Sequence, residues 1–160
     1  MEQQYTNTLT PEFKASLERT YFSAEQKAAM PDDGRFYVEE QETFLREHPV
    51  IAIYRIAVEG SLTQRGGLVR TVWNGSEIQL KDWGRVNIAL EGDEVVYSDG
   101  STARIISGSG TSIQKNGRCI ALVGSRLSNG DQIVSTPQST GTLVEREGVP
   151  MGDDFLIEGV

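Results

Sequence analysis

The sequence contains one short motif three times: Ile56-Ala57-Val58-Glu59-Gly60-Ser61, Ile88-Ala89-Leu90-Glu91-Gly92-Asp93 and Ile120-Ala121-Leu122-Val123-Gly124-Ser125. Successive copies begin 32 residues apart. Each copy is typical of a short strand that ends at a glycine, where a positive φ has little steric cost, followed by a small polar residue that can bond the turn. A unit this short cannot bury a core by itself, so we expect the three copies to pack on each other.

A glycine turn and a β-branched run follow each copy of the motif within a few residues. We expect these glycines, together with those of the motif itself, to be the repeat turns: Gly60, Gly66, Gly67, Gly92, Gly100, Gly124 and Gly130. We expect the apolar positions of the motif to form the repeat core: Ile56, Ile88, Ile120, Ala57, Ala89 and Ala121. Three similar units around one axis would give the chain approximate threefold symmetry, which would let it sit on a true homotrimer.

Glycine is distributed unevenly, and this divides the chain into two predicted parts. Of the 17 glycines, only Gly34 and Gly60 fall within the first 60 residues. The pattern predicts a helical extension over residues 1–49 and a turn-dense β domain over residues 50–160. The predicted fold class is therefore mainly β, with three short β repeats forming a compact cone of pseudo-threefold symmetry, plus an N-terminal α-helical extension.

Several helix signals lie within the extension. Thr10-Pro11 predicts an N-cap followed by proline in the first turn, and Ser23 begins a capping box that ends at Gln26. Residues 31–34, Pro-Asp-Asp-Gly, predict a turn. Residues 35–47 fit either an amphipathic helix or an extended segment, so both readings stay open.

Strand signals begin after Pro49, where the β-branched residues 50–58 predict a buried strand. Further strands are predicted over residues 68–73, 86–90, 94–97, 104–106, 119–123, 132–134 and 142–144. An Asn74-Gly75 pair lies between Trp73 and Trp83 and predicts a hairpin turn.

Composition excludes several classes of partner. The 160 residues carry a formal net charge of −8, so we expect no nucleic-acid backbone as a partner. No run approaches the roughly 20 apolar residues of a membrane helix, and no stable membrane anchor is predicted. Cys119 and His48 are each the single residue of their type, which excludes a disulfide framework and a multi-cysteine zinc knuckle.

No group of residues resembles a reaction site, so we expect the chain not to be an enzyme. A His48–Cys119 thiol dyad is disfavoured because Cys119 alternates with apolar residues on a repeat strand. Acidic pairs such as Asp32-Asp33 and Glu39-Glu40 are typical of solvated faces and turns. Residues 108–112 lack the Gly-Lys-[Ser/Thr] ending of a phosphate loop.

The repeats resemble a known family. Residues 116–130 are similar to the core repeat of PAAR-domain proteins, which is roughly Asn-Gly-[Lys/Arg]-Pro-Ala-Ala-Arg-Val-Gly-Asp followed by Thr-x-His-Gly-Gly. Residues 60–67, Gly-Ser-Leu-Thr-Gln-Arg-Gly-Gly, resemble the Gly-Asp-x-Thr-x-His-Gly-Gly element, and Ser107-Gly108-Ser109 looks like the family's Ile-x-Gly-Ser turn. The resemblance covers about residues 50–145 and leaves the helical extension outside.

The resemblance implies a structural role in an assembly. PAAR proteins are small β-rich cones that sit on the tip of the trimeric VgrG spike of type VI secretion systems and related contractile tails, and they can tether effectors. By this resemblance we expect one copy per homotrimeric VgrG-type spike, with an effector or chaperone as a partner of the extension. Such a protein would be assembled in the bacterial cytoplasm and exported with the spike to the extracellular space or a target cell.

The sequence departs from the family in two ways. The Pro-Ala-Ala-Arg run is replaced by Asn87-Ile88-Ala89-Leu90 and Cys119-Ile120-Ala121-Leu122. The family's apex is usually pinned by a zinc ion held by histidines and a cysteine, and the resemblance places other residues at those positions: Arg65, Tyr97, Asp99 and Asn129. We therefore expect no zinc and no other cofactor. The tip would be held by packing, hydrogen bonds or ion pairs involving Arg65 and Asp99.

Two alternative functions remain open at this point. The repeats could be the scaffold of a β-rich ligand-binding or enzymatic domain, which would bind no spike. The chain could also be the tip of a phage or bacteriocin tail spike, which would act mechanically in the same way. The neighbouring genes would distinguish this alternative from a secretion system.

Overall fold

The computed structural model of the chain describes residues 3–80 and 84–157, so Trp83 lies outside the described residues. The chain folds into two compact units. The β unit comprises Met1–Asn7, Tyr54–Leu143 and Met151–Val160, and the helical unit comprises Thr8–Ile53 and Val144–Pro150. The boundary predicted between residues 49 and 50 therefore differs from the observed division. The first residues belong to the β unit, and a late segment belongs with the helices.

The helical unit contains three helices, α1 (Pro11–Glu18), α2 (Ala24–Ala28) and α3 (Asp32–Glu47). Both predicted caps are confirmed. The Thr10 hydroxyl accepts a hydrogen bond from the Phe13 N–H at 3.1 Å, and Ser23 forms the capping box with Gln26.

Helix α3 resolves the segment that the sequence left open. Residues 35–47 are helical, and the helix begins at Asp32, so the turn predicted over residues 31–34 is wrong. Pro31 needs no N–H at this position, and the carboxylates of Asp32 and Asp33 interact favourably with the positive end of the helix dipole.

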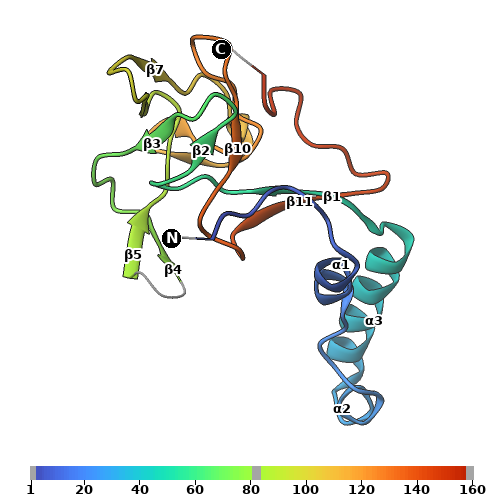
Figure 1. Ribbon diagram of the computed structural model, residues 1–160. Coiled ribbons are helices and arrows are strands. Elements are labelled where there is room, and N and C mark those ends of the chain that lie inside the picture. The colour runs from blue at the N-terminus through green and yellow to red at the C-terminus, as the bar shows by residue number, and fades with distance from the viewer. Residues whose placement is uncertain (1–2, 81–83, 158–160) are drawn as a thin grey trace. The chain divides into compact units, whose positions relative to one another are not determined.

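The β unit is built from short strands that form small sheets (Figure 1). An antiparallel five-stranded sheet has the order β10-β2-β3-β6-β7. Its strands are β2 (Leu62–Thr63), β3 (Leu68–Arg70), β6 (Glu94–Val96), β7 (Thr102–Arg104) and β10 (Ile133–Ser135). Two two-stranded sheets join β4 (Glu77–Leu80) to β5 (Gly84–Asn87) and β8 (Gln114–Lys115) to β9 (Arg118–Cys119). A further two-stranded sheet joins β1 (Val50–Arg55) to β11 (Thr142–Arg146), and most residues of these two strands belong to the helical unit. A 3-10 helix, η1, spans Gly110–Ser112.

The three copies of the motif close a ring of backbone hydrogen bonds through their alanines, which we call the alanine ring. The Ala57 N–H donates to the Ala121 carbonyl at 2.9 Å, Ala121 to Ala89 at 2.9 Å, and Ala89 to Ala57 at 3.0 Å. Antiparallel bridges flank the ring in the same cyclic order: Ile56 with Leu122, Val58 with Ile88, and Leu90 with Ile120. The predicted arrangement of three β repeats with pseudo-threefold symmetry is confirmed.

The glycine turns repeat with the same hydrogen bonds in every copy. The motif glycines have positive φ values of 95° at Gly60, 91° at Gly92 and 108° at Gly124. The side chain that follows each glycine accepts a bond from the N–H three residues earlier. These bonds join Ser61 to Val58 (3.0 Å), Asp93 to Leu90 (2.9 Å) and Ser125 to Leu122 (2.9 Å).

The core of the β unit differs in part from the expected residues. Ala57, Ala89 and Ala121 are fully buried, where three chain segments meet and a larger side chain has no room. The three motif isoleucines are only half-buried, whereas the residues two positions later are completely enclosed: Val58, Leu90 and Leu122. Each of these enclosed residues lies two positions before the motif glycine, at which the chain folds back over its side chain. The isoleucines lie four positions before that glycine.

The sequence placed one hairpin turn incorrectly. Strands β4 and β5 pair from Glu77 with Asn87 to Leu80 with Gly84, so β4 pairs with the strand that follows it and Asn74-Gly75 is not the turn of a hairpin (Figure 1). Asn74 instead bonds across the entry to the hairpin. Its amide nitrogen donates to the Ile88 carbonyl at 2.8 Å, and its amide oxygen accepts from the Ser76 N–H at 2.9 Å.

Candidate functional site

Five residues from the turn regions of all three repeats form one hydrogen-bonded group, which we call the turn cluster: Thr63, Arg65, Tyr97, Asn129 and Asp131. The repeats supply these residues from matching turns. In each turn a glycine N–H donates at 3.0 Å to the carbonyl three residues earlier, from Gly66 to Thr63, from Gly100 to Tyr97 and from Gly130 to Leu127.

Asp131 is the centre of the turn cluster and is only 2% exposed. One carboxylate oxygen, Oδ1, accepts from the backbone N–H groups of Gln132 at 2.8 Å and Arg65 at 3.2 Å. The other, Oδ2, accepts from the Tyr97 hydroxyl at 2.7 Å, and the Thr63 hydroxyl also bonds this carboxylate. A buried carboxylate needs such partners, and here they come from all three repeats.

Asn129 links the same three turns around the outside of Asp131. Its amide nitrogen donates to the Tyr97 hydroxyl at 3.0 Å, and its amide oxygen accepts from the Asp131 N–H at 3.0 Å. Its backbone carbonyl accepts from the Arg65 guanidinium at 3.0 Å. The structure thus brings together three of the four positions that the sequence singled out at the tip.

The hydrogen bonds fix the protonation states within the turn cluster. Burial raises the pKa of the Asp131 carboxyl, but bonds from Thr63, Tyr97 and the backbone outweigh it and leave the pKa below its ordinary value. Burial, together with the bond to Asp131, raises the pKa of the Tyr97 hydroxyl. At neutral pH Asp131 is therefore a carboxylate, and Tyr97 is a neutral phenol that donates to it.

Asp99, the fourth position, does not join the turn cluster. Its Oδ1 accepts from the N–H of Ser101 at 2.9 Å and from the hydroxyl of Ser101 at 2.6 Å, and these bonds lower the pKa of Asp99. The expected ion pair between Arg65 and Asp99 is absent from the ion pairs of the described residues. A short aspartate beside a turn glycine bonds its own backbone more readily than a distant guanidinium.

The donors of the turn cluster do not fit the zinc site that the family resemblance suggests. Tetrahedral zinc takes about four nitrogen, sulfur or carboxylate ligands. Asp131 is the only carboxylate in the cluster, its oxygens already accept hydrogen bonds, and the Arg65 guanidinium is a donor only. Across residues 3–80 and 84–157, no three side chains of histidine, cysteine, aspartate or glutamate are grouped to hold a metal.

No family model, curated protein or solved structure matches this chain. Functional inference therefore depends on the geometry of the two units. In the part of the chain that the structure describes, no helix has the length and apolarity needed to cross a bilayer.

The residues considered for a catalytic role, His48 and Cys119, lie in different units. The His48 ring nitrogen Nδ1 lies 2.8 Å from the Glu147 carbonyl in the helical unit. Cys119 is buried on β9 in the β unit, and burial raises the pKa of its thiol, which disfavours the reactive thiolate. Within residues 108–112, the Thr111 N–H in η1 donates to the Asp154 carboxylate at 2.8 Å.

A cavity beside Cys119 is the feature closest to a ligand site in the β unit. Its volume is about 110 Å³, and its lining includes three glycines and the carboxylate of Asp154. Ordinary small-molecule sites occupy roughly 300–1,000 Å³. The cavity holds a few water molecules at most and gives the ligand-binding alternative little support.

Sequence reasoning missed two members of the turn cluster, Thr63 and Asp131. Asp131 follows the turn glycine Gly130 in the run Leu-Ser-Asn-Gly-Asp, where the other repeats have Gly67 and Ser101. A carboxylate that replaces a small residue at an otherwise repeated turn was an available signal. Thr63 had no comparable signal, because threonine is common in strands.

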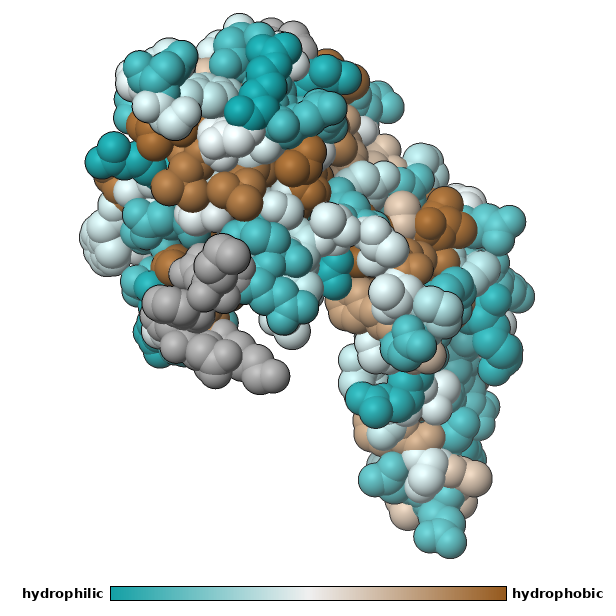
Figure 2. Space-filling model, viewed as in Figure 1, coloured by the Kyte–Doolittle hydropathy of each residue, from teal (hydrophilic) through white to brown (hydrophobic). Residues whose placement is uncertain are grey.

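A second feature of the β unit is an exposed apolar pair. Strand β3 follows the turn at Gly67 and ends at Arg70. Val72 and Trp73 come shortly after it and are 74% and 75% exposed. The hairpin bonds, Thr63 with Gly67 and Ser61 with Val69, place these two residues beyond the open end of the hairpin. Figure 2 shows further apolar surface on the visible face of the β unit. Leu68 and Val134 are also partly exposed.

Proposed function

We propose that the β unit is the tip of a trimeric spike in a contractile injection system. In this role the pseudo-threefold body docks its broad end on three equivalent spike chains, and the turn cluster forms the narrow end. The protein then acts mechanically, and its helical unit is carried along with the spike.

The observation that carries the proposal is the alanine ring. One chain closes a threefold cycle of backbone bonds, Ala57 to Ala121 to Ala89 and back to Ala57, with distances that agree within 0.1 Å. A single chain with three nearly equivalent faces can satisfy three identical partner chains at once. The family resemblance of residues 50–145 points to the same partner, a VgrG-type homotrimer.

The turn cluster supports a tip that is closed without metal. Zinc in the resembled family joins turns from different repeats, and here Asp131 joins them by accepting bonds from Thr63, Arg65 and Tyr97. Charge-assisted hydrogen bonds of this kind are stronger than neutral ones, so they can replace a cross-link at a point that bears load.

Val72 and Trp73 are the residues we propose for spike contact. They lie past the open end of a repeat hairpin and expose large apolar surfaces, and tryptophan is common at the energetic centre of interfaces. Assembly in the bacterial cytoplasm and export together with the spike follow from this role.

The decisive experiment is co-expression with trimeric spike proteins encoded in the same genome, followed by native mass spectrometry. We expect a complex of one copy per three spike chains. Trp73→Asp is expected to weaken this complex at least about tenfold, because it places a charge in an apolar contact. Ser98→Asp places the same charge in an exposed turn of the second repeat and is expected to leave binding unchanged.

Three results would contradict the proposal. They are the absence of any complex with the spikes of its genome, a stoichiometry other than one to three, and equal effects of the two aspartate substitutions. A thermal shift caused by a small molecule, in a protein that binds no spike, would favour the ligand-binding alternative.

A further inference from the structure

Helix α3 carries an amphipathic stripe that the helical unit leaves largely exposed, although the Phe44 ring contacts the His48 ring with centroids 4.5 Å apart. Phe36 is 63% exposed and Phe44 is 43% exposed, and their spacing of eight positions places both on one face of the helix. They border a shallow hollow whose other lining residues are Glu39, Glu40, Thr43 and Glu47. We call these six residues the α3 stripe.

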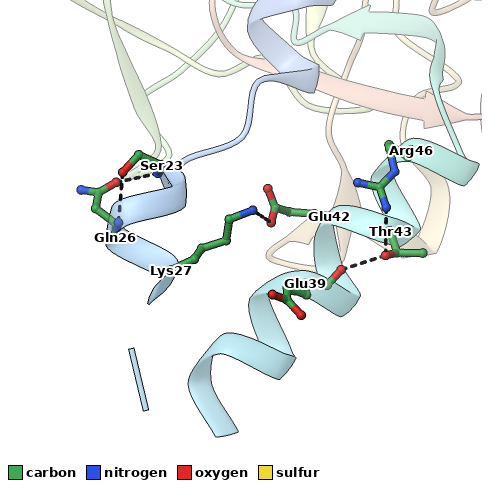
Figure 3. Close-up of polar contacts among 7 residues, drawn as sticks. All are labelled: Ser23, Gln26, Lys27, Glu39, Glu42, Thr43 and Arg46. Atoms are coloured by element: carbon green, nitrogen blue, oxygen red, sulfur yellow. Dashed lines mark hydrogen bonds and ion pairs between the residues drawn. The ribbon is translucent and has the colours of Figure 1, made fainter. Parts of the chain in front are cut away.

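The α3 stripe carries three carboxylates, those of Glu39, Glu40 and Glu47. Of the other acidic residues of α3, Asp32 pairs with Arg35, Glu42 pairs with Lys27 at 2.9 Å (Figure 3), and Asp33 in the first turn forms no ion pair within the unit. Glu39, Glu40 and Glu47 form no ion pair among residues 8–53 and 144–150, all of which the structure describes.

Figure 3 shows the polar contacts of two residues of the stripe, Glu39 and Thr43. The backbone carbonyl of Glu39 accepts from the Thr43 hydroxyl at 2.9 Å, and the Glu39 carboxylate bonds none of the residues drawn. Arg46 reaches Thr43 from the border of the stripe, at 3.2 Å from its hydroxyl, and contacts no carboxylate of the stripe. The surface therefore presents two aromatic anchors and three unpaired negative charges.

We propose that the α3 stripe binds a basic amphipathic helix of a partner protein. The apolar face of that helix contacts Phe36 and Phe44 and fills the space over the smaller Thr43 between them. Its lysine or arginine side chains face Glu39, Glu40 and Glu47. A wholly apolar partner is disfavoured because it would bury three carboxylates without partners.

The length of the stripe sets the length of the occupant. Residues 36–47 span about 17 Å at 1.5 Å per residue, which corresponds to about three helical turns. A helix of about 12 residues therefore covers it. This inference does not depend on the spike proposal, because the stripe belongs entirely to the helical unit.

The test measures the binding of a fluorescent helical peptide of about 14 residues to the full chain. The peptide has leucines at i, i+3, i+4 and i+7 spacing and lysines elsewhere, and its twin has glutamate in place of lysine. We expect the lysine peptide to bind, the glutamate twin not to bind, and affinity to fall as salt rises.

Matched variants separate the stripe from general charge attraction. Phe36→Ala is expected to weaken binding at least about fivefold. Tyr37→Ala, which removes an equally exposed neighbour that lines a different hollow, should change it less than about twofold. The double change Glu40→Gln with Glu47→Gln should weaken binding more than Glu12→Gln with Glu25→Gln, which removes the same charge from exposed sites on α1 and α2.

Several outcomes would overturn the inference. Failure of the lysine peptide to bind would do so, as would equal effects within either pair of variants, with folding of each variant checked by circular dichroism. A concentration-dependent dimer of the chain that Phe36→Ala abolishes would identify a second copy as the occupant instead.

Discussion

Asp131 joins the turns of all three repeats through its carboxylate. Its carboxylate accepts bonds from Thr63, Arg65 and Tyr97 while being almost fully buried. We expect Asp131→Asn to lower the free energy of unfolding by about 2–3 kcal/mol, because an amide leaves buried donors without an acceptor. Urea unfolding followed by far-UV circular dichroism measures the change.

Asp99→Asn is the control for this substitution. Asp99 is exposed, and its bonds involve only Ser101 within its own turn. Asp99→Asn should therefore lower the free energy of unfolding clearly less than Asp131→Asn does. If the two aspartates cost the same, the turn cluster does not hold the repeats together.

The pKa of the same carboxyl group predicts that the stability of the turn cluster depends on acid pH. Hydrogen bonds place the pKa of Asp131 below its ordinary value, which is about 3.9 in an unfolded chain. The stabilisation is therefore present above that unfolded value and is lost as the pH falls through the folded pKa. We expect the free energy of unfolding to drop between about pH 5 and pH 2, and to drop less in Asp131→Asn. An equal slope in both proteins would contradict this assignment.

Glycine has opposite roles in the repeat elements and in the helices. A Cβ at Gly108 would lie 2.3 Å from the Ile120 carbonyl oxygen, which accepts the Ser109 N–H. We expect Gly108→Ala to destabilise the β unit by about 1–3 kcal/mol, because strand and loop must separate. At Gly34 in α3 a Cβ meets nothing within 4 Å, and Gly34→Ala should stabilise that helix by up to about 1 kcal/mol.

Calorimetry measures the change in stability caused by Gly108→Ala. Thermal melting followed by circular dichroism at 222 nm measures the change caused by Gly34→Ala. Opposite signs are the expected result. A neutral effect of Gly108→Ala would mean that the contact between the Ser107-Gly108-Ser109 turn and the third repeat is loose.

The elements predicted best are those whose signals are local. Thr10 and Ser23 marked the starts of α1 and α2 because an N-cap depends only on residues within one turn. The three motif copies located the alanine ring because a fixed spacing imposes equivalent positions. The turn predicted over residues 31–34 failed because the same residues also suit the first turn of a helix.

The turn cluster was only partly predictable because its bonds join residues far apart in the sequence. Arg65, Tyr97 and Asn129 were found through the resemblance, although nothing local to them indicates that they meet. Asp99 has the same position in its turn as Arg65 and Asn129, and its bonds to Ser101 exclude it from the cluster. Whether a turn residue bonds a neighbour in its own turn or a residue in another repeat depends on the three-dimensional structure. The spacing of residues in the sequence does not indicate which partner it will have.

At the scale of the whole molecule, the two units differ in what holds them together. The β unit encloses a continuous core around the alanine ring, including Val69, Val95 and Ile105. None of the three helices of the helical unit contains a buried residue. Helices without a buried face gain little from tertiary packing, so the helical unit should open at a lower free energy than the β unit.

Hydrogen exchange followed by mass spectrometry measures this difference along the chain. We expect the amides of Ala57, Ala89 and Ala121 to be the slowest to exchange, since each is bonded to a neighbouring repeat and fully buried. Amides of α1, α2 and α3 should exchange at least about a hundredfold faster, through opening of the helical unit alone. Equal protection in both units would mean that they unfold as one. Selective protection of α3 on adding the lysine peptide would show that an occupied α3 stripe supplies the packing that the helices lack.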